Sequence, residues 1–276
     1  MTFIYSRSYR GPLQAIIFDW AGTVLDYGCM APAAVFMDVF ARKGVPITMD
    51  EARGPMGAHK RTHIQDITRM PAVAERWRKK HGRAPTERDV DAMYADFIPL
   101  QVACLSRYSK LIPGTLKAVE ACRRRGMKIG TTTGYDAAMT AVNLKDAAKQ
   151  GFEPDHTVSA SDVPQGRPSP YMALLNVIHL KVSTVEACVK VDDTVPGIDE
   201  GLNAGMWTIG VAVSGNEVGL PLAELRRLPK ADYAARRQRA YARMRQAGAH
   251  FVVDSVADIL PCLDAIQERL AAGQKP

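Results

Sequence analysis

The fold of this chain is decided by the stretch Ala15-Ile16-Ile17-Phe18-Asp19-Trp20-Ala21-Gly22-Thr23. A run of about four to five apolar residues that ends at a turn signal is typical of a strand buried on both faces of a parallel sheet. The strand ends at Asp19, and ligands of open α/β sheets bind at the carboxyl ends of strands. Asp19 is therefore predicted to be a nucleophile or a metal ligand. The competing interpretation is an aspartate that only caps a helix or a turn.

The composition is that of an ordinary globular protein. The chain has 276 residues, 47% of them hydrophobic, which suffices for one large domain or two smaller ones. No signal-peptide pattern is present, and no apolar run approaches the ~18 residues needed to cross a bilayer. The five cysteines lack the spacing of a disulfide framework or a zinc site. We therefore expect a cytoplasmic protein with reduced thiols and no membrane partner.

The net charge of +7 favours anionic ligands. Much of the excess lies in residues 226–245, where eight basic residues are interleaved with Tyr233 and Tyr241. On a helix such residues most often form a solvated face, and contact with a nucleic acid is the less favoured interpretation. We expect no nucleic-acid partner, and a small anionic substrate is consistent with the remaining charge.

Helical and strand patterns divide the chain into a core and an insertion. Between residues 29 and 106 only helical spacing is found, in the stretches 32–43, 49–56, 60–68, 72–81 and 88–104. Elsewhere, after the first strand, the strands predicted at 127–131, 157–160, 187–191, 208–213 and 251–253 alternate with helices. The sequence therefore predicts a doubly wound, Rossmann-like α/β core at residues 1–28 and 107–276 with an inserted all-α cap at residues 29–106. We call residues 29–106 the helical insertion.

A second acidic site, Asp192 and Asp193, follows the predicted strand 187–191. Because the carboxyl ends of parallel strands meet at one edge of a sheet, these carboxylates are expected near Asp19. Carboxylates that converge beside a phosphate describe a Mg²⁺ site, and their mutual repulsion is costly without the cation. For the Asp192-Asp193 pair alone, a helix N-cap is the alternative.

Two stretches between the acidic sites are suited to holding a phosphoryl group. Thr133 supplies a hydroxyl and Gly134 a bare amide at the end of a strand, next to an expected helix N-terminus. Arg167 adds a fixed positive charge that can bind two oxygens at once. Each signal is weak by itself, and their order along the chain is the informative part.

The order Asp-x-x-Gly-Thr, strand-Thr, basic residue, strand-Asp-Asp resembles that of the haloacid dehalogenase superfamily over essentially the whole chain. The resemblance implies that Asp19 is a nucleophile that forms an aspartyl-phosphate. It also implies that Thr133 and Arg167 hold the phosphoryl oxygens.

The same resemblance implies Mg²⁺ as the cofactor. Its ligands would be a carboxylate oxygen of Asp19, the backbone carbonyl of Ala21 and the carboxylate of Asp193. The last acid of the usual metal motif is absent from this chain, and Asp192 is the candidate that replaces it.

Ala21 departs from the phosphatases and mutases of that superfamily, which normally have a general-acid aspartate at this position. General acid catalysis is worth about 10²–10⁴ in rate, so a phosphomonoesterase is expected to retain this acid. A phosphonate fits better, because its phosphorus–carbon bond leaves carbon rather than oxygen behind. A protonated imine on the adjacent carbon would turn that leaving group into a neutral enamine, and such an imine needs a lysine.

Lys60 is the candidate for that imine, and His63 shares its helix face at i,i+3. A free lysine with a pKa of ~10.4 is less than ~0.1% neutral at pH 7, and burial or neighbouring cations would lower this pKa. His63 is predicted to carry protons during imine formation or to the enamine carbon. Taken alone, Lys60 also fits a surface lysine on a basic helix.

Together these features resemble the phosphonatases, a family within the superfamily. The matching stretches are 19–23, 27–29, 55–63, 132–135 and 203–208. The resemblance implies that Lys60 forms a Schiff base and that Cys29, Met56 and Tyr135 line a pocket between insertion and core. From the residues alone, those three are more often plain packing residues.

The activity implied by this resemblance is hydrolysis of phosphonoacetaldehyde to acetaldehyde and phosphate, within 2-aminoethylphosphonate degradation. The implied assembly is a homodimer through the cap. Two alternatives remain. A phosphomonoesterase or phosphosugar mutase of the same superfamily is opposed by Ala21, and a non-catalytic nucleic-acid binder would use residues 226–245.

Overall fold

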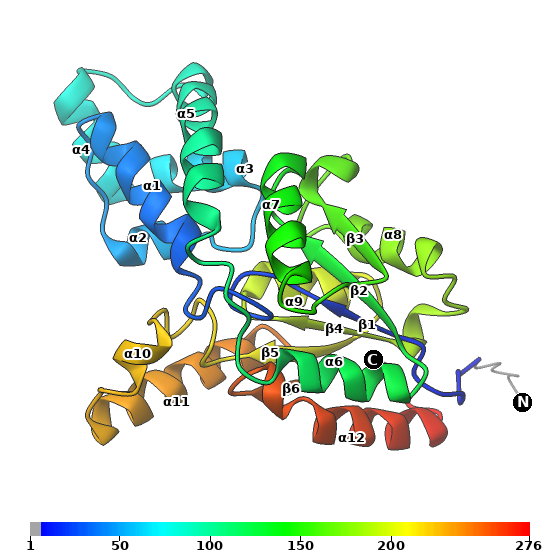
Figure 1. The fold of residues 1–276 in the computed structure, drawn as a ribbon. Coiled ribbons are helices and arrows are strands. Elements are labelled where there is room, and N and C mark those ends of the chain that lie inside the picture. Colours follow the sequence, from blue (N-terminus) through cyan, green and yellow to red (C-terminus); the bar gives the residue numbers. More distant parts are fainter. Residues whose placement is uncertain (1–6) are drawn as a thin grey trace, which may run out of the picture.

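A parallel β-sheet lies at the centre of the structure, a computed structural model that describes residues 7–276 (Figure 1). Within these residues the sheet has six strands in the order β3-β2-β1-β4-β5-β6. The strands are β1 (Ala15–Phe18), β2 (Lys128–Thr133), β3 (His156–Ser159), β4 (Cys188–Asp192), β5 (Trp207–Val211) and β6 (Phe251–Val253). The strand that ends before Asp19 is therefore central, hydrogen-bonded to β2 on one side and β4 on the other.

Helices cover both faces of the sheet because β1 is apolar on both sides. Ile16 and Phe18 pack in one cluster with α6 (Thr115–Arg124) and α12 (Leu260–Ala271). Ala15 and Ile17 pack in another with α8 (Tyr171–His179) and with Ala204 at the end of α9 (Val195–Asn203). Since alternate residues of a strand point to opposite faces, the predicted doubly wound α/β fold is confirmed.

The core contains further helices. They are α7 (Ala137–Ala148), α10 (Leu222–Leu225) and α11 (Lys230–Gln246), with 3₁₀ turns at Ala160–Asp162, Val185–Ala187 and Val256–Asp258. A helix is expected from the sequence after Gly134, but the bounds of α7 are not, because its buried face includes Thr140 and Asn143 and so breaks the apolar pattern. The basic stretch 226–245 lies mostly on α11, where only Ala240 and Met244 are buried, in agreement with a solvated face.

The helical insertion consists of α1 (Met30–Arg42), α2 (Met49–Arg53), α3 (Lys60–Arg69), α4 (Pro71–His81) and α5 (Glu87–Leu105). Figure 1 shows these helices gathered to one side of the sheet. They share an apolar cluster around Phe36, Phe97 and Trp77, and this cluster also takes in Tyr135 and Met139 of the core. The insertion therefore has an apolar centre of its own and a packed contact with the strand-end region of the core.

The inserted all-α segment is thus confirmed, while its exact limits at residues 29 and 106 stay a prediction. Residues 1–6 of the predicted core lie outside the described residues. Among residues 7–276, no helix combines the length and the apolar character needed to cross a membrane.

Two glycines allow α9 to lie directly on β4. Gly197 and Gly201 are four residues apart and so share one face of the helix. A Cβ at Gly201 would lie 2.7 Å from the Cβ of Lys190 and 2.8 Å from Cγ2 of Thr208. At Gly197 a Cβ would lie 1.9 Å from Cγ of Asp192. Because α9 lies so close to β4, side chains of this helix can contact residues at the carboxyl end of the strand.

We expect Gly201→Ala to lower the free energy of unfolding by about 1–2 kcal/mol, because the cost of overpacking exceeds the gain of up to ~1 kcal/mol in helix propensity. Denaturant titration measures this change. Gly166→Ala is the matched control, since its Cβ would meet only ordinary contacts at 3.7 Å and 3.9 Å. Equal stabilities of the two variants would contradict the close packing of α9.

Candidate active site

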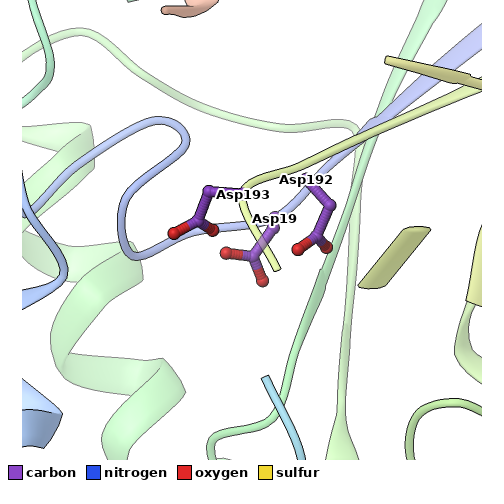
Figure 2. A group of neighbouring side chains, drawn as sticks. All are labelled: Asp19, Asp192 and Asp193. Carbon is purple, nitrogen blue, oxygen red and sulfur yellow. The ribbon is translucent and has the colours of Figure 1, made fainter. Parts of the chain in front are cut away.

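Three buried carboxylates converge at the carboxyl end of the sheet. Asp19 follows β1, Asp192 is the last residue of β4, and Asp193 comes next. One oxygen of each lies within 4.8 Å of the others. Figure 2 shows the carboxylate of Asp19 between those of Asp193 and Asp192. The two strand ends that the sequence predicts to be adjacent do bring these side chains together.

Asp192 is neutralised by basic side chains. Its Oδ2 accepts from Nζ of Lys190 at 2.7 Å and lies 3.3 Å from Nη2 of Arg167. Its Oδ1 accepts from the hydroxyl and the backbone N–H of Thr194. Burial alone would raise the pKa of Asp192, but Arg167 and Lys190 outweigh it and hold the pKa below its usual value. A role for Asp192 as third metal ligand stays a prediction. Its contacts favour a structural role instead, as the carboxylate that binds the side chains of Lys190 and Arg167.

Asp193 has hydrogen bonds but no cation. Its Oδ2 accepts from the backbone N–H of Asn216 at 2.7 Å, and its Oδ1 accepts from the hydroxyl of Thr23 at 3.3 Å. Within residues 7–276, no lysine or arginine forms an ion pair with it. Burial, with Asp19 and Asp192 adding to it, raises the pKa of Asp193 well above its usual value. A buried carboxylate in this condition is suited to a bound cation.

Gly22 makes room for Asp193 within the motif that opens the chain. It has φ +88°, and a Cβ there would lie 2.1 Å from Oδ2 of Asp193. Only glycine adopts this conformation without strain while leaving the carboxylate in place. The Gly-Thr pair that follows Ala21 is therefore explained by the shape of the acidic site.

Asp19 is contacted by Arg167, whose Nη2 lies 2.7 Å from Oδ1 of the aspartate. Burial and the neighbouring Asp192 raise the pKa of Asp19, while Arg167 and Lys190 oppose the rise. The arginine therefore stabilises the ionised carboxylate, which is the nucleophilic form.

A small cavity of about 20 Å³ lies between the core and the insertion. The sequence-predicted residues that line it are Asp19, Ala21, Cys29, Met56, Lys60, Thr133, Gly134, Tyr135 and Arg167. A space of this size holds one or two water molecules at most. The structure therefore shows the insertion closed over the core, with the predicted pocket residues gathered around one point.

Lys60 begins α3 and is buried, with only 4% of its surface exposed. Its Nζ lies 4.9 Å from the ring centre of Tyr135 and 5.6 Å from that of Phe36. Burial is the main cause that lowers its pKa to about 8, and Arg167 contributes. At pH 7 a lysine with a pKa of ~8 is about one-tenth neutral, so a reactive amine is present in the closed cavity.

His63 lies one helical turn from Lys60 but is not among the residues that line the cavity. Its Nε2 lies 2.9 Å from the backbone carbonyl oxygen of Ala52, and its ring stacks on Phe36 at 3.8 Å between centres. Burial, together with Lys60, lowers the pKa of His63 well below its usual value. These contacts join α3 to α2 and α1, and proton transfer by His63 stays a prediction.

Several residues of the site are not predicted from the sequence. Pro32, Gly57 and Thr194 also line the cavity. Gly57 has φ +95°, and a Cβ there would lie 2.4 Å from Oγ1 of Thr194, so the insertion loop touches the core motif. Lys190, a charge inside an otherwise apolar strand, is the signal that could have revealed buried ion pairs beneath the site.

Arg53, also not predicted, connects the insertion to the core. Its Nη1 donates to the carbonyl oxygen of Gly28 at 2.9 Å and to Oδ1 of Asn216 at 3.1 Å, and its Nη2 donates to the carbonyl oxygen of Gly219. Asn216 in turn donates its backbone N–H to Asp193. A hydrogen-bonded chain therefore runs from α2 of the insertion to the acidic site.

Comparison with known proteins places this geometry in a family. Residues 13–205 match the model of the haloacid dehalogenase-like hydrolases. The phosphonoacetaldehyde hydrolase of Hahella chejuensis is 47% identical over 276 residues, covering 100% of this chain and 94% of that protein. The phosphonoacetaldehyde hydrolase of Aeromonas hydrophila is 48% identical over 266 residues, covering 96% of this chain and 95% of that protein.

Solved structures agree with these matches. The crystal structure of a phosphonoacetaldehyde hydrolase-like protein from Oleispira antarctica has a TM-score of 0.97 and 42% identity, with 100% of both chains covered. A putative β-phosphoglucomutase from Bacteroides vulgatus has a TM-score of 0.65 at 20% identity, covering 94% of this chain and 90% of that one. The second likeness concerns the fold alone.

The two adjacent aspartates should respond oppositely to substitution in metal-free protein. Asp192→Asn leaves Lys190 and Arg167 short of a buried partner and should lower the free energy of unfolding at pH 7 by about 3–5 kcal/mol. Asp193→Asn removes an uncompensated carboxylate and should leave the stability unchanged or raise it. Chemical denaturation in the presence of a chelator measures both, and a comparable loss in Asp193→Asn would contradict the charge assignment.

Proposed function

The chain belongs to the phosphonoacetaldehyde hydrolase family of the haloacid dehalogenase-like hydrolases, and on this premise we propose that it cleaves the phosphorus–carbon bond of phosphonoacetaldehyde. The products are acetaldehyde and phosphate. The observation that supports this activity most strongly is a buried lysine of the insertion and a buried aspartate of the core lining one small cavity. An amine and a carboxylate in that arrangement can act on two centres of one small substrate, the aldehyde carbon and the phosphorus, which are separated by one methylene carbon.

In the proposed reaction Lys60 first condenses with the aldehyde, and water is lost as the imine forms. The imine nitrogen takes up a proton. The carboxylate of Asp19 then attacks phosphorus, the phosphorus–carbon bond breaks, and its electron pair enters the protonated imine to give a neutral enamine. Protonation of the enamine carbon and hydrolysis of the imine release acetaldehyde and regenerate the lysine. Water cleaves the aspartyl-phosphate and returns Asp19.

Ala21 supports a carbon leaving group. Its side chain lines the cavity at the position where phosphomonoester-cleaving relatives are expected to have an acid, and it offers no proton to a departing oxygen. In the imine route the protonated imine accepts the electron pair, so no acid is needed at that position.

The phosphoryl group would be held by Arg167, Thr133 and the backbone amide of Gly134, which all line the cavity. Mg²⁺ would be held by the carboxylates of Asp193, which has no other cation, and of Asp19. The family resemblance implies the backbone carbonyl of Ala21 as a further ligand. When bound, the cation would offset the repulsion between carboxylates and phosphoryl oxygens.

The assembly stays a proposal based on family resemblance: a homodimer through the helical insertion, with a small phosphonate as the only ligand besides the metal. Contact of residues 226–245 with nucleic acid remains the less favoured alternative. Two of the arginines there are paired with acids of the same chain, Arg237 with Asp254 and Arg243 with Glu217.

The activity is tested by measuring acetaldehyde and phosphate release from phosphonoacetaldehyde and phosphate release from a panel of phosphomonoesters, each with and without Mg²⁺. We expect equal amounts of the two products, dependence on Mg²⁺, and little turnover of the esters. Asp19→Asn should lower the rate by at least about 10³-fold, because it removes the nucleophile. Efficient ester cleavage without acetaldehyde release would favour the phosphomonoesterase alternative instead.

The imine is tested by borohydride reduction in the presence of substrate, with the labelled residue located by mass spectrometry. Lys60 should be labelled, Lys60→Ala should not, and Lys117→Ala, which changes an exposed lysine of α6, should behave as wild type. The trapping rate should rise about tenfold per pH unit below the pKa of about 8 and level off above it, because only the neutral amine attacks the aldehyde. An unchanged trapping rate between pH 6 and 8 would contradict the lowered pKa.

A further inference from the structure

Glu200 is a buried acid to which the proposed reaction gives no role. It lies on α9, its side chain has no exposed surface, and it does not line the cavity. Its Oε2 accepts from Nε of Arg167 at 2.9 Å and lies 3.3 Å from Nζ of Lys190. The same oxygen also accepts from the hydroxyl of Thr132. Such a buried carboxylate is costly unless its contacts serve the fold or the site.

The contact with Glu200 fixes the direction of Arg167. Nε donates to Glu200, while Nη2 lies 2.7 Å from Oδ1 of Asp19 and donates to the backbone carbonyl oxygen of Thr132 at 3.0 Å. A guanidinium group is planar and rigid, so two anchored nitrogens determine where the third one points. Among the described residues Nη1 makes no hydrogen bond, and it remains available to a phosphoryl oxygen.

The packing of α9 against β4 places Glu200 beside Arg167. Gly197 and Gly201 let the helix lie against Asp192 and Lys190 of β4, closer than any side chain would permit. Thr194 caps the helix by accepting the backbone N–H of Gly197 at 3.2 Å. The Glu200 carboxylate is therefore held beside Arg167, near the carboxyl end of β4, by a helix rather than by a loop.

Without Glu200, the guanidinium would have Asp19 and Asp192 as its carboxylate partners. A planar guanidinium beside a carboxylate favours two parallel N–H···O bonds. Arg167 would then turn more of its nitrogens onto Asp19, which would occupy both nucleophilic oxygens and withdraw donors from the phosphoryl group.

We propose that Glu200 is a positioning residue that holds Arg167 by Nε, so that one nitrogen contacts Asp19 and another stays free for a phosphoryl oxygen. This inference rests on the proposed function in one respect only, that the ligand of Arg167 is a phosphoryl group. Glu200 itself does not line the cavity that holds the amine, so condensation of Lys60 with an aldehyde that carries no phosphoryl group serves as a second readout.

The test uses Glu200→Gln, Glu200→Asp and Glu200→Ala in the full chain, with Asp199→Asn, the adjacent acid of the same helix, as the matched control. Glu200→Asp keeps the charge and shortens the reach. Inorganic phosphate is the probe, and its binding is measured by calorimetry with and without Mg²⁺. Borohydride trapping of Lys60 with acetaldehyde, which has no phosphoryl group for Arg167 to hold, and the melting temperature are measured on the same samples.

We expect Glu200→Gln and Glu200→Asp to bind phosphate about tenfold to hundredfold more weakly, as is typical when a charge-assisted hydrogen bond is lost. Glu200→Ala should lose at least as much, and Asp199→Asn should bind as wild type. Trapping of Lys60 should continue at the wild-type rate in Glu200→Gln and Glu200→Asp. If Glu200→Ala does not fold, the two milder variants still decide the question.

Phosphate binding equal to wild type in Glu200→Gln and Glu200→Asp would overturn the proposal. So would a parallel loss of phosphate binding and of Lys60 trapping, because that result indicates a general structural role. Weaker phosphate binding in a protein whose wild type shows no phosphonoacetaldehyde cleavage would refute the proposed function and leave the role of Glu200 intact.

Discussion

The balance of buried charge at the ends of β1 and β4 is the constraint on which the site depends. Asp192 and Glu200 are matched by Lys190 and Arg167, while Asp193 has no cation among the described residues. At these strand ends one aspartate is therefore neutralised by basic side chains, while its neighbour has hydrogen bonds but no cation. The two neighbouring aspartates therefore differ in role: Asp192 stabilises the buried basic side chains, and Asp193 is suited to binding a cation.

The insertion supplies the reactive amine that the core lacks. The core contributes a nucleophile, a guanidinium and a hydroxyl, and the insertion contributes the amine of Lys60 and the loop at Gly57 that touches Thr194. Neither part holds both reactive groups. The hydrogen bonds of Arg53 to the core tie the closed position of α2 to the residue that orients Asp193.

Much of this arrangement could be predicted from the sequence, because Asp19, Thr133 and Asp193 follow apolar strands and strand ends meet at one edge. The prediction that Lys60 belongs to the site depended on a motif resemblance, and in the structure Lys60 does line the cavity. Glu200 and Asn216 could not be predicted, since a buried charge is recognisable only beside its partner, and Asn216 acts through its backbone. The spacing that pairs His63 with Lys60 is helical, yet one turn is enough to move the imidazole out of the cavity lining.

The cavity of about 20 Å³ has a chemical consequence for the lysine inside it. A partly neutral amine condenses with almost any aldehyde it meets, and cells contain many. In this structure Lys60 is buried against Phe36 and Tyr135, and the cavity must enlarge before any aldehyde, phosphonoacetaldehyde included, can reach the amine. The same burial that lowers the pKa of the amine thus also keeps carbonyl compounds away from it while the insertion lies against the core, so that reactivity and protection have a single physical origin.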